Sequence, residues 1–169
     1  ELPGYYNLRH PSGNINITNC NLQSRSSGLR IGYEDQNSVR NINVSNINIT
    51  NSNRGIGIFV RDSGSIENIS ISQVKIETRL HTGDWWGNGE PIHISAVRGK
   101  PGIALGHIKN VTLRDIICKS ENGILIYGTE ENIIENVKLE GKPTIYNSRM
   151  YVSHRRLGLV TAVNIDNPE

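Results

Sequence analysis

Apolar and polar residues alternate along most of this chain in short runs, and the clearest runs begin with asparagine. Each run has the form asparagine, apolar, polar, apolar. The asparagines that open them are Asn14, Asn41, Asn68, Asn110 and Asn136. The differences between successive numbers are 27, 27, 42 and 26. A period of this size is typical of a solenoid of stacked units, so we expect units of about 27 residues with one unit enlarged.

Within each unit the apolar residues fall into three pairs with a spacing of two. In the second unit the pairs are Ile42 with Val44, Ile47 with Ile49, and Ile56 with Ile58. Alternation at period two among β-branched residues predicts β-strands with one apolar side. Asn, Ser, Gly and Asp separate the pairs, and no stretch has the apolar spacing of a helix. Each unit is therefore predicted to hold three short strands.

Two repeat architectures have a period near this one. A leucine-rich repeat requires leucines at fixed offsets and usually a helical segment. This chain instead has many isoleucines and few leucines. We therefore expect an all-β fold, a right-handed parallel β-helix of about five coils. Stacked coils lie about 4.8 Å apart and place like residues above like, so the repeated asparagines should form a ladder of side-chain amides.

The chain of 169 residues is expected to form a single domain. We expect a lead-in at 1–13, coils over 14–140 with an inserted loop at 78–91 and a second excursion at 98–106, and a terminal coil or edge at 141–169. The net charge of +2 is too small to argue for nucleic acid. The chain has no run of about 18 apolar residues, so no membrane span is predicted. Its N-terminus lacks the layout of a signal peptide.

The repeat also places the two cysteines. Cys20 falls in the inward column of Ile47, and Cys118 falls in the inward column of Ile49. They are three coils apart, about 14 Å at 4.8 Å per coil, which is beyond the roughly 7 Å between Cα atoms that a disulfide tolerates. We predict two free, buried thiols.

The third pair of each unit is the best candidate for carrying function. Its inward positions are apolar throughout, while its outward positions vary between units, as on the binding face of a solenoid. By parity the outward residues are Arg30, Gly32, Gly57, Phe59, Arg61, His93, Ser95, Leu125 and Tyr127. They predict a groove that contains arginines and aromatic side chains.

The inserted loop at 78–91 interrupts this face. It contains Arg79, His81, Asp84, Trp85, Trp86 and Glu90, and so both tryptophans of the chain. Two adjacent tryptophans in a glycine-flanked loop cannot both enter a solenoid core. An exposed indole suits the apolar face of a sugar ring, and nearby arginines suit carboxylates. The alternative is that the tryptophans only cover exposed apolar side chains of a coil.

Three segments resemble consecutive coils of the polygalacturonase-like glycoside hydrolases of family 28. They are 26–32 (Ser-Ser-Gly-Leu-Arg-Ile-Gly), 53–59 (Asn-Arg-Gly-Ile-Gly-Ile-Phe) and 66–69 (Ile-Glu-Asn-Ile). The stretch 81–96 is similar to a bacterial branch of that family, and the resemblance covers roughly 14–140. It implies a secreted or periplasmic, pectin-directed enzyme that inverts at the anomeric carbon and uses aspartates as acid and base in a β-helix groove.

The chain departs from the family pattern at the catalytic positions. The family's Asn-Thr-Asp segment and Asp-Asp pair are absent. Ser27 and Gly28 stand where the resemblance implies a His-Gly pair, and Gly57, Ile58 and Phe59 stand where it implies Arg-Ile-Lys. No family catalytic residue is therefore carried over to this chain. Positive charge for a uronate could come from other arginines, namely Arg30, Arg54 and Arg61.

If the chain is active by itself, its own residues must supply the chemistry. Inverting hydrolysis requires two carboxyl groups about 6.5 to 9.5 Å apart, and a histidine can assist proton transfer. The catalytic candidates are Asp84, Glu90 and His93, with Glu34, Asp35 and Asp62 as further acids near the groove strands. The residues expected to bind substrate are Arg30, Arg54, Phe59, Arg61, His81, Trp85 and Trp86. No cofactor is expected, and no metal site, because the histidines and acids lack tight ligand spacing.

Three questions about function stay open at this point. The chain could be the C-terminal part of a longer enzyme whose acids lie elsewhere, which its abrupt start favours, or a complete chain with a rearranged site. It could instead be a non-catalytic carbohydrate-binding or assembly module. A polysaccharide lyase would need a basic residue near the uronate C5 and often calcium, for which no acidic cluster is evident.

The expected partner is an acidic plant cell-wall polysaccharide or oligosaccharide, and neither nucleic acid nor a membrane. A β-helix that ends in a bare coil exposes unpaired backbone and apolar core. Such ends tend to pair with other strands, so a homo-oligomer through exposed helix ends is also expected.

Overall fold

The computed structural model describes residues 10–81, 83, 86–129, 134–141, 144–147 and 160–161. These residues are all-β and include no helix. The strands lie in two sheets, and every pairing between strands is parallel. No helix in the described part of the chain is long and apolar enough to cross a membrane.

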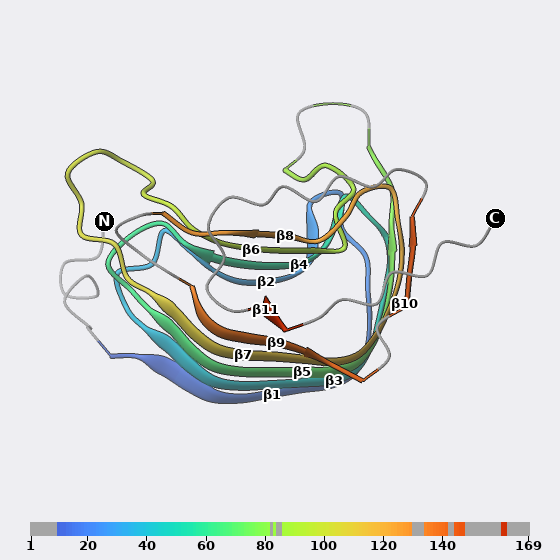
Figure 1. Cartoon of the computed structure of the whole chain (residues 1–169), viewed down its shortest axis with the longest axis horizontal. Helices are drawn as coiled ribbons and strands as arrows, with labels where there is room; N and C mark the ends of the chain where they lie inside the picture. The colour runs from blue at the N-terminus through green and yellow to red at the C-terminus, as the bar shows by residue number, and fades with distance from the viewer. Residues whose placement is uncertain are drawn as a thin grey trace, which may run out of the picture.

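The first sheet contains the long strands of the repeat. It holds β1 (Ser12–Leu22), β3 (Val39–Ser52), β5 (Ile66–Thr78), β7 (Ile108–Ser120), β9 (Glu135–Glu140) and β11 (Val160–Thr161) in that order, with β10 (Thr144–Asn147) paired to β7. The second sheet holds β2 (Ser27–Tyr33), β4 (Arg54–Val60), β6 (Ile92–Ala96) and β8 (Leu125–Tyr127). Figure 1 shows the first sheet running along the bottom and bending upward, while the second sheet faces it across the core.

From β1 to β9 the chain alternates between the two sheets, and the register of the strands confirms the predicted period. Ile15 pairs with Ile42, and Ile42 pairs with Ile69, each 27 residues further on. Ile69 then pairs with Val111, 42 residues on, which is the enlarged unit. Its extra residues lie between the end of β5 at Thr78 and the start of β6, and between β6 and β7, where Figure 1 shows two excursions at opposite ends of the sheets.

The prediction of three strands per unit was wrong. The first two apolar pairs of the second unit belong to one continuous strand, β3, in which Ile42, Val44, Ile47 and Ile49 are all buried. The asparagines between them do not end the strand. They adopt left-handed backbone angles, with φ of 54° at Asn46 in this strand, which bends the strand while the pairing continues on both sides. Asparagine adopts this region more readily than most residues.

The asparagine ladder is confirmed. The amide Nδ2 of Asn41 donates to Oδ1 of Asn14 at 3.1 Å, and Asn68 donates to Asn41 at 3.1 Å. Asn110 donates to Asn68 at 3.0 Å, and Asn136 donates to Asn110 at 2.8 Å. One column of amides therefore links five neighbouring strands of the first sheet, close to where each strand begins.

The core between the sheets consists mainly of isoleucine. The inward pairs of the second sheet are fully buried in its central strands, with 0% exposure for Ile56, Ile58, Ile92 and Ile94. Both cysteines are free thiols in their predicted columns, since Cys20 pairs with Ile47 and Ile76 pairs with Cys118. Cys118 is buried, and burial raises its pKa to about 12. Cys20 is only half-buried, because β1 lies at the edge of the sheet.

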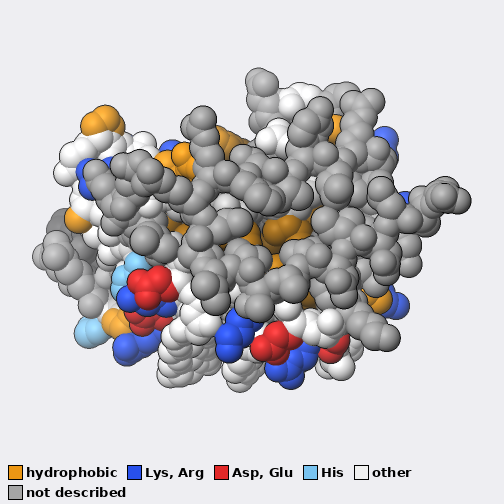
Figure 2. All heavy atoms as spheres, in the orientation of Figure 1, with side chains coloured by type: hydrophobic (Ala, Val, Ile, Leu, Met, Phe, Trp, Pro, Cys, Tyr) orange, Lys and Arg blue, Asp and Glu red, His pale blue; other side chains and the backbone are white. Residues whose placement is uncertain are grey.

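Outside the core, charged side chains form ion pairs between neighbouring strands of the first sheet. Nζ of Lys109 on β7 lies 3.1 Å from Oε1 of Glu135 on β9. On the same two strands, Nη2 of Arg114 lies 2.7 Å from Oε2 of Glu140. Figure 2 shows acidic and basic side chains in contact along the lower edge of the molecule. Exposed pairs of this kind contribute little stability, so the buried isoleucines and the parallel pairing hold the fold together.

Candidate functional site

A groove of about 590 Å³ lies over the outward face of the second sheet, between its strands and the inserted loop. The predicted site residues that line it are Arg30, Arg54, Phe59, Arg61, Trp86 and His93. A larger hollow of about 970 Å³ follows the bend of the first sheet, but mainly asparagine and apolar side chains line it. Arginines, aromatic rings and a histidine meet only in the first of these two hollows, which is therefore the candidate site.

The register of the second sheet brings the groove residues together. Arg30 pairs with Gly57, and Gly57 pairs with His93 on the next strand. Glycine leaves room here for Phe59, since a Cβ at Gly57 would lie 2.5 Å from an atom of the phenyl ring. The ring lies against the edge of His93, with centroids 5.0 Å apart, and beneath the guanidinium carbon of Arg54, also at 5.0 Å. Phe59 is only 6% exposed, so little of its ring is open to a ligand. Its main role is to support the side chains of His93 and Arg54.

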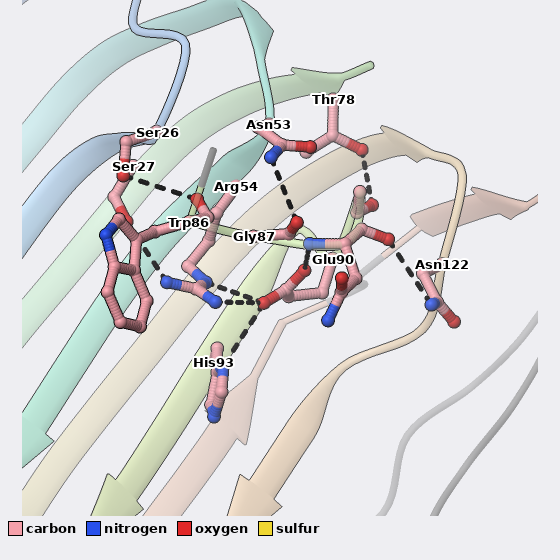
Figure 3. Close-up of polar contacts among 12 residues, drawn as sticks. Ser26, Ser27, Asn53, Arg54, Thr78, Trp86, Gly87, Glu90, His93 and Asn122 are labelled. Atoms are coloured by element: carbon pink, nitrogen blue, oxygen red, sulfur yellow. Dashed lines mark hydrogen bonds and ion pairs between the residues drawn. The ribbon is translucent and has the colours of Figure 1, made fainter. Parts of the chain in front are cut away.

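A buried ionic cluster forms the floor of the groove. Arg54 places Nε 2.6 Å and Nη2 2.5 Å from Oε1 of Glu90. The same oxygen lies 3.1 Å from Nδ1 of His93, and the backbone amide of Asn88 donates to Oε2 at 2.5 Å. Figure 3 shows these groups converging on the Glu90 carboxylate, with Nε2 of His93 on the far side of the ring. Arg54 is 7% exposed and Glu90 4%, so the charges are largely shielded from water.

The surroundings of Glu90 keep it ionised. Burial raises the pKa of its carboxyl group, but the hydrogen bond from His93 and the charge of Arg54 lower it more. The net result is a pKa lowered from 4.5 to about 2. Glu90 is therefore a carboxylate at neutral pH, which accepts hydrogen bonds and has no proton to donate.

Tyr33 is the centre of a second, more open cluster. The guanidinium carbons of Arg30 and Arg61 lie 5.4 and 5.1 Å from the centroid of its ring. The rings of Trp86 and Phe59 meet it edge to face at 6.2 and 6.3 Å. Trp86 is 66% exposed, and its indole is therefore open to a ligand.

Charge on this second cluster is only partly balanced. Arg61 Nε lies 3.7 Å from Oε1 of Glu34, too far for a hydrogen bond. The same nitrogen has no hydrogen-bond partner among the described residues, although it is buried. Arg30 is exposed on the neighbouring strand. The two guanidinium groups therefore present positive charge to the groove close to one tyrosine ring.

Hydrogen bonds hold the end of the inserted loop over the second sheet. Ser26 Oγ donates to the carbonyl of Trp86 at 3.2 Å, and Asn53 Nδ2 donates to the carbonyl of Gly87 at 2.9 Å. Thr78 Oγ1 donates to the carbonyl of Gly89 at 2.6 Å. The positions of Trp86 and Glu90 are thus set by contacts with Ser26 and Asn53, which directly precede β2 and β4, and with Thr78 at the end of β5 (Figure 3).

Several predicted site residues lie elsewhere. His81 places Nε2 2.9 Å from the carbonyl oxygen of Asn51 and does not line the groove, so it fastens the loop to β3. Asp84 and Trp85 lie outside the described residues. Asp62 accepts the backbone amide of Ser63 at 2.6 Å, as a turn residue does. In the described part of the chain, no group of three or more His, Cys, Asp or Glu residues could hold a metal ion.

Sequence reasoning missed Tyr33. Simple alternation places it inward, in line with Leu29 and Ile31, yet it lines the groove. The cause is Gly32, whose φ of 72° reverses the alternation at the end of the strand. A glycine at the end of an alternating run, followed by an aromatic residue, was the available signal.

Comparison with known proteins adds no family to this geometry. None of the family models, curated proteins or solved structures compared with the chain matches it. What the site can do is therefore argued from its residues. It combines an exposed arginine, a second arginine that is only partly balanced, an exposed indole and a histidine held by a buried carboxylate, which suits a ligand with both anionic groups and apolar ring faces.

Proposed function

We propose that the groove binds a uronate-containing polysaccharide of the pectic type, and that the chain is a right-handed parallel β-helix of the polygalacturonase-like kind. The helical path is supported by the alternation of the chain between two parallel sheets from β1 to β9. Crossovers between parallel strands are right-handed in nearly all proteins, which supports the handedness.

The observation that carries the proposal is the cluster around Tyr33. Arg30 and Arg61 both lie close to its ring, and the exposed indole of Trp86 lies next to it. A uronate residue has a carboxylate for an arginine and an apolar ring face for an indole. A uronate carboxylate could pair with the arginine charge that Glu34, 3.7 Å from Arg61, balances only in part, so the cluster favours an acidic sugar over a neutral one.

The state of Glu90 favours binding over hydrolysis by the described residues alone. Inverting hydrolysis needs one carboxylic acid that gives a proton and one carboxylate that activates water. Glu90 is buried, ion-paired to Arg54 and has its pKa lowered to about 2, so it cannot serve as that acid. This supports the earlier alternative in which the acids come from coils of a longer enzyme.

Hydrolysis by this chain is the second candidate, and one observation favours it. His93 lines the groove with one ring nitrogen held by a carboxylate, an arrangement that serves proton transfer in many enzymes. In that case Asp84, which belongs to the same loop, would be the proton donor.

The test is the affinity of the chain for trigalacturonate beside that of the neutral galactotriose, measured by titration calorimetry. We expect binding of the acidic trimer and at least tenfold weaker binding of the neutral one. Arg30→Ala should weaken binding of the acid about tenfold, because a hydrogen bond to a charged group contributes about 1.5 to 3 kcal/mol. Arg114→Ala is the matched control, since this exposed arginine lies on the first sheet.

Two outcomes would decide against parts of the proposal. Equal affinity for the acidic and neutral trimers would contradict recognition of uronate. Release of reducing ends from polygalacturonate by this chain would favour the second candidate, and loss of that release in Asp84→Asn would assign the proton donor.

A further inference from the structure

The hydrogen bonds of the floor cluster determine where His93 carries its proton. Glu90 is a carboxylate and only accepts hydrogen bonds. Its Oε1 lies 3.1 Å from Nδ1 of His93, so this contact requires a hydrogen on Nδ1. In a neutral imidazole the other nitrogen, Nε2, then carries a free lone pair.

We propose that Glu90 is a positioning residue that fixes the tautomer and orientation of His93, so that Nε2 is the atom offered to a hydroxyl group of the ligand. This changes the role expected for Glu90 from a catalytic carboxyl group to a support beneath the groove. Only the identity of the ligand rests on the proposed function. The state of the imidazole is a property of the free protein.

Glu90 itself is held in place from three directions. Arg54 binds Oε1 through two nitrogens, and the backbone amide of Asn88 binds Oε2. The carbonyl oxygen of Glu90 accepts the backbone amide of Gly55 at 3.1 Å, which ties the loop to β4. A carboxylate with so many donors has little freedom to rotate, and the orientation of His93 depends on it.

Arg54 has a separate purpose in this arrangement. Glu90 is only 4% exposed, and burying an unpaired carboxylate to this extent would destabilise the fold. Arg54 balances the charge of Glu90. The pair is neutral in sum, so Glu90 can orient the imidazole without adding net negative charge to a groove that binds anions. Phe59 holds the guanidinium against its ring face and meets the edge of His93, which fixes the ring from a second side.

The consequence for recognition is specific. With Nδ1–H directed at Glu90, the neutral imidazole accepts a hydrogen bond through Nε2 and cannot donate one there. Sugar hydroxyl groups are donors, whereas carboxylates are acceptors. His93 is therefore suited to a hydroxyl group of the sugar, while Arg30 and Arg61 are suited to the carboxylate. This division of roles fixes the direction in which a uronate can lie across the groove.

The test is long-range ¹H–¹⁵N NMR of the histidine rings in the ligand-free, ¹⁵N-labelled chain at pH 8. For His93 we expect a protonated Nδ1 and an unprotonated Nε2. His81 is the internal control, because its Nε2 contacts the carbonyl oxygen of Asn51 and must carry the hydrogen instead. His93→Gln identifies the His93 signals by their disappearance. In Glu90→Leu, which has no acceptor for the hydrogen on Nδ1, the Nδ1–H tautomer should no longer dominate, while His81 stays unchanged.

A His93 ring protonated on Nε2 in the unmodified chain would overturn the proposal, and so would an unchanged tautomer in a folded Glu90→Leu variant. If that variant does not fold, the measurement on the unmodified chain still decides. A second arm measures trigalacturonate affinity in His93→Gln, where we expect at least a fivefold loss without a change in melting temperature. The expected tautomer together with no binding of any trimer would leave this inference standing and contradict the proposed function instead.

Discussion

The carboxylate of Glu90 is surrounded by groups that hold it in its ionised form. Arg54 and the backbone amide of Asn88 bind the carboxylate directly. His93 contacts the same oxygen, Oε1 of Glu90, that Arg54 binds. The same contacts disappear in the unfolded chain, where a glutamate titrates near 4.5. A difference in pKa between the folded and unfolded states makes stability depend on pH.

The sign of this dependence follows from the lowered pKa. The stabilisation by ionised Glu90 is fully present above pH 4.5 and is lost as the pH falls through about 2. We expect Glu90 to account for up to about 3 kcal/mol of the loss in unfolding free energy over this range. Urea denaturation at pH 6 and at pH 2.5 measures it, and Glu90→Gln should show a smaller difference between the two conditions.

Glu77→Gln is the control for that measurement. Glu77 forms an exposed pair with Lys119 at 3.5 Å, which should contribute little. If acid lowered the unfolding free energy equally in the unmodified chain and in Glu90→Gln, the result would contradict the assignment of this loss to Glu90.

At the scale of the strand, the left-handed asparagines join backbone shape to side-chain bonding. Asn68 has a φ of 58°, donates to Asn41 and accepts from Asn110. Its place in the centre of the ladder makes it the best position for separating the two effects. A substitution to glycine removes the amide but keeps the backbone angle free of strain, whereas alanine removes the amide and adds strain.

We expect Asn68→Ala to lower the unfolding free energy by about 2 to 4 kcal/mol and Asn68→Gly by about 1 to 2 kcal/mol. Chemical denaturation of both variants beside the unmodified chain measures the two values. The difference between the variants reports the strain of the left-handed angle, and the loss in the glycine variant reports the ladder. If the glycine variant were as unstable as the alanine variant, backbone strain would make no contribution to the destabilisation by Asn68→Ala.

The strands also show what the sequence could predict and what it could not. The inward columns, the ladder and the position of the inserted loop follow from alternation and spacing, because a parallel register repeats the same environment in each unit. The continuity of β3 through Asn46 and the reversed alternation at Gly32 depend on local backbone angles. The pairing of Glu90 with Arg54 depends on how a loop folds back over a strand 36 residues earlier, which no local pattern encodes.

At the scale of the whole molecule, the net charge of +2 conceals an uneven distribution. Many charged side chains of the first sheet are paired across strands, as Arg114 is with Glu140. In the groove, Glu90 balances Arg54, but Arg30 and Arg61 remain close together around one tyrosine ring. A small total charge is therefore compatible with a locally basic groove, and the total alone could not have revealed it.

The outer edge of the first sheet suggests self-association. Among the described residues, β1 pairs with a strand on one side only. Ile15 lies in the same column as Ile42, which is 3% exposed, but is itself 41% exposed because no described strand covers it. An open edge with apolar side chains favours pairing with another strand. We expect the average mass in solution to rise above that of the monomer as the concentration increases, measured by light scattering.

Substitutions at two exposed isoleucines distinguish pairing at the sheet edge from non-specific association through exposed apolar surface. Ile15 is 41% exposed at the open edge, and Ile117 is 45% exposed in the middle of the sheet, on β7. A lysine at an edge position blocks strand addition, because a second strand would have to bury its charge. Ile15→Lys should therefore keep the chain monomeric, whereas Ile117→Lys should leave association unchanged. A monomeric unmodified chain at high concentration would contradict edge pairing, and equal effects of both substitutions would assign the association to exposed apolar surface in general.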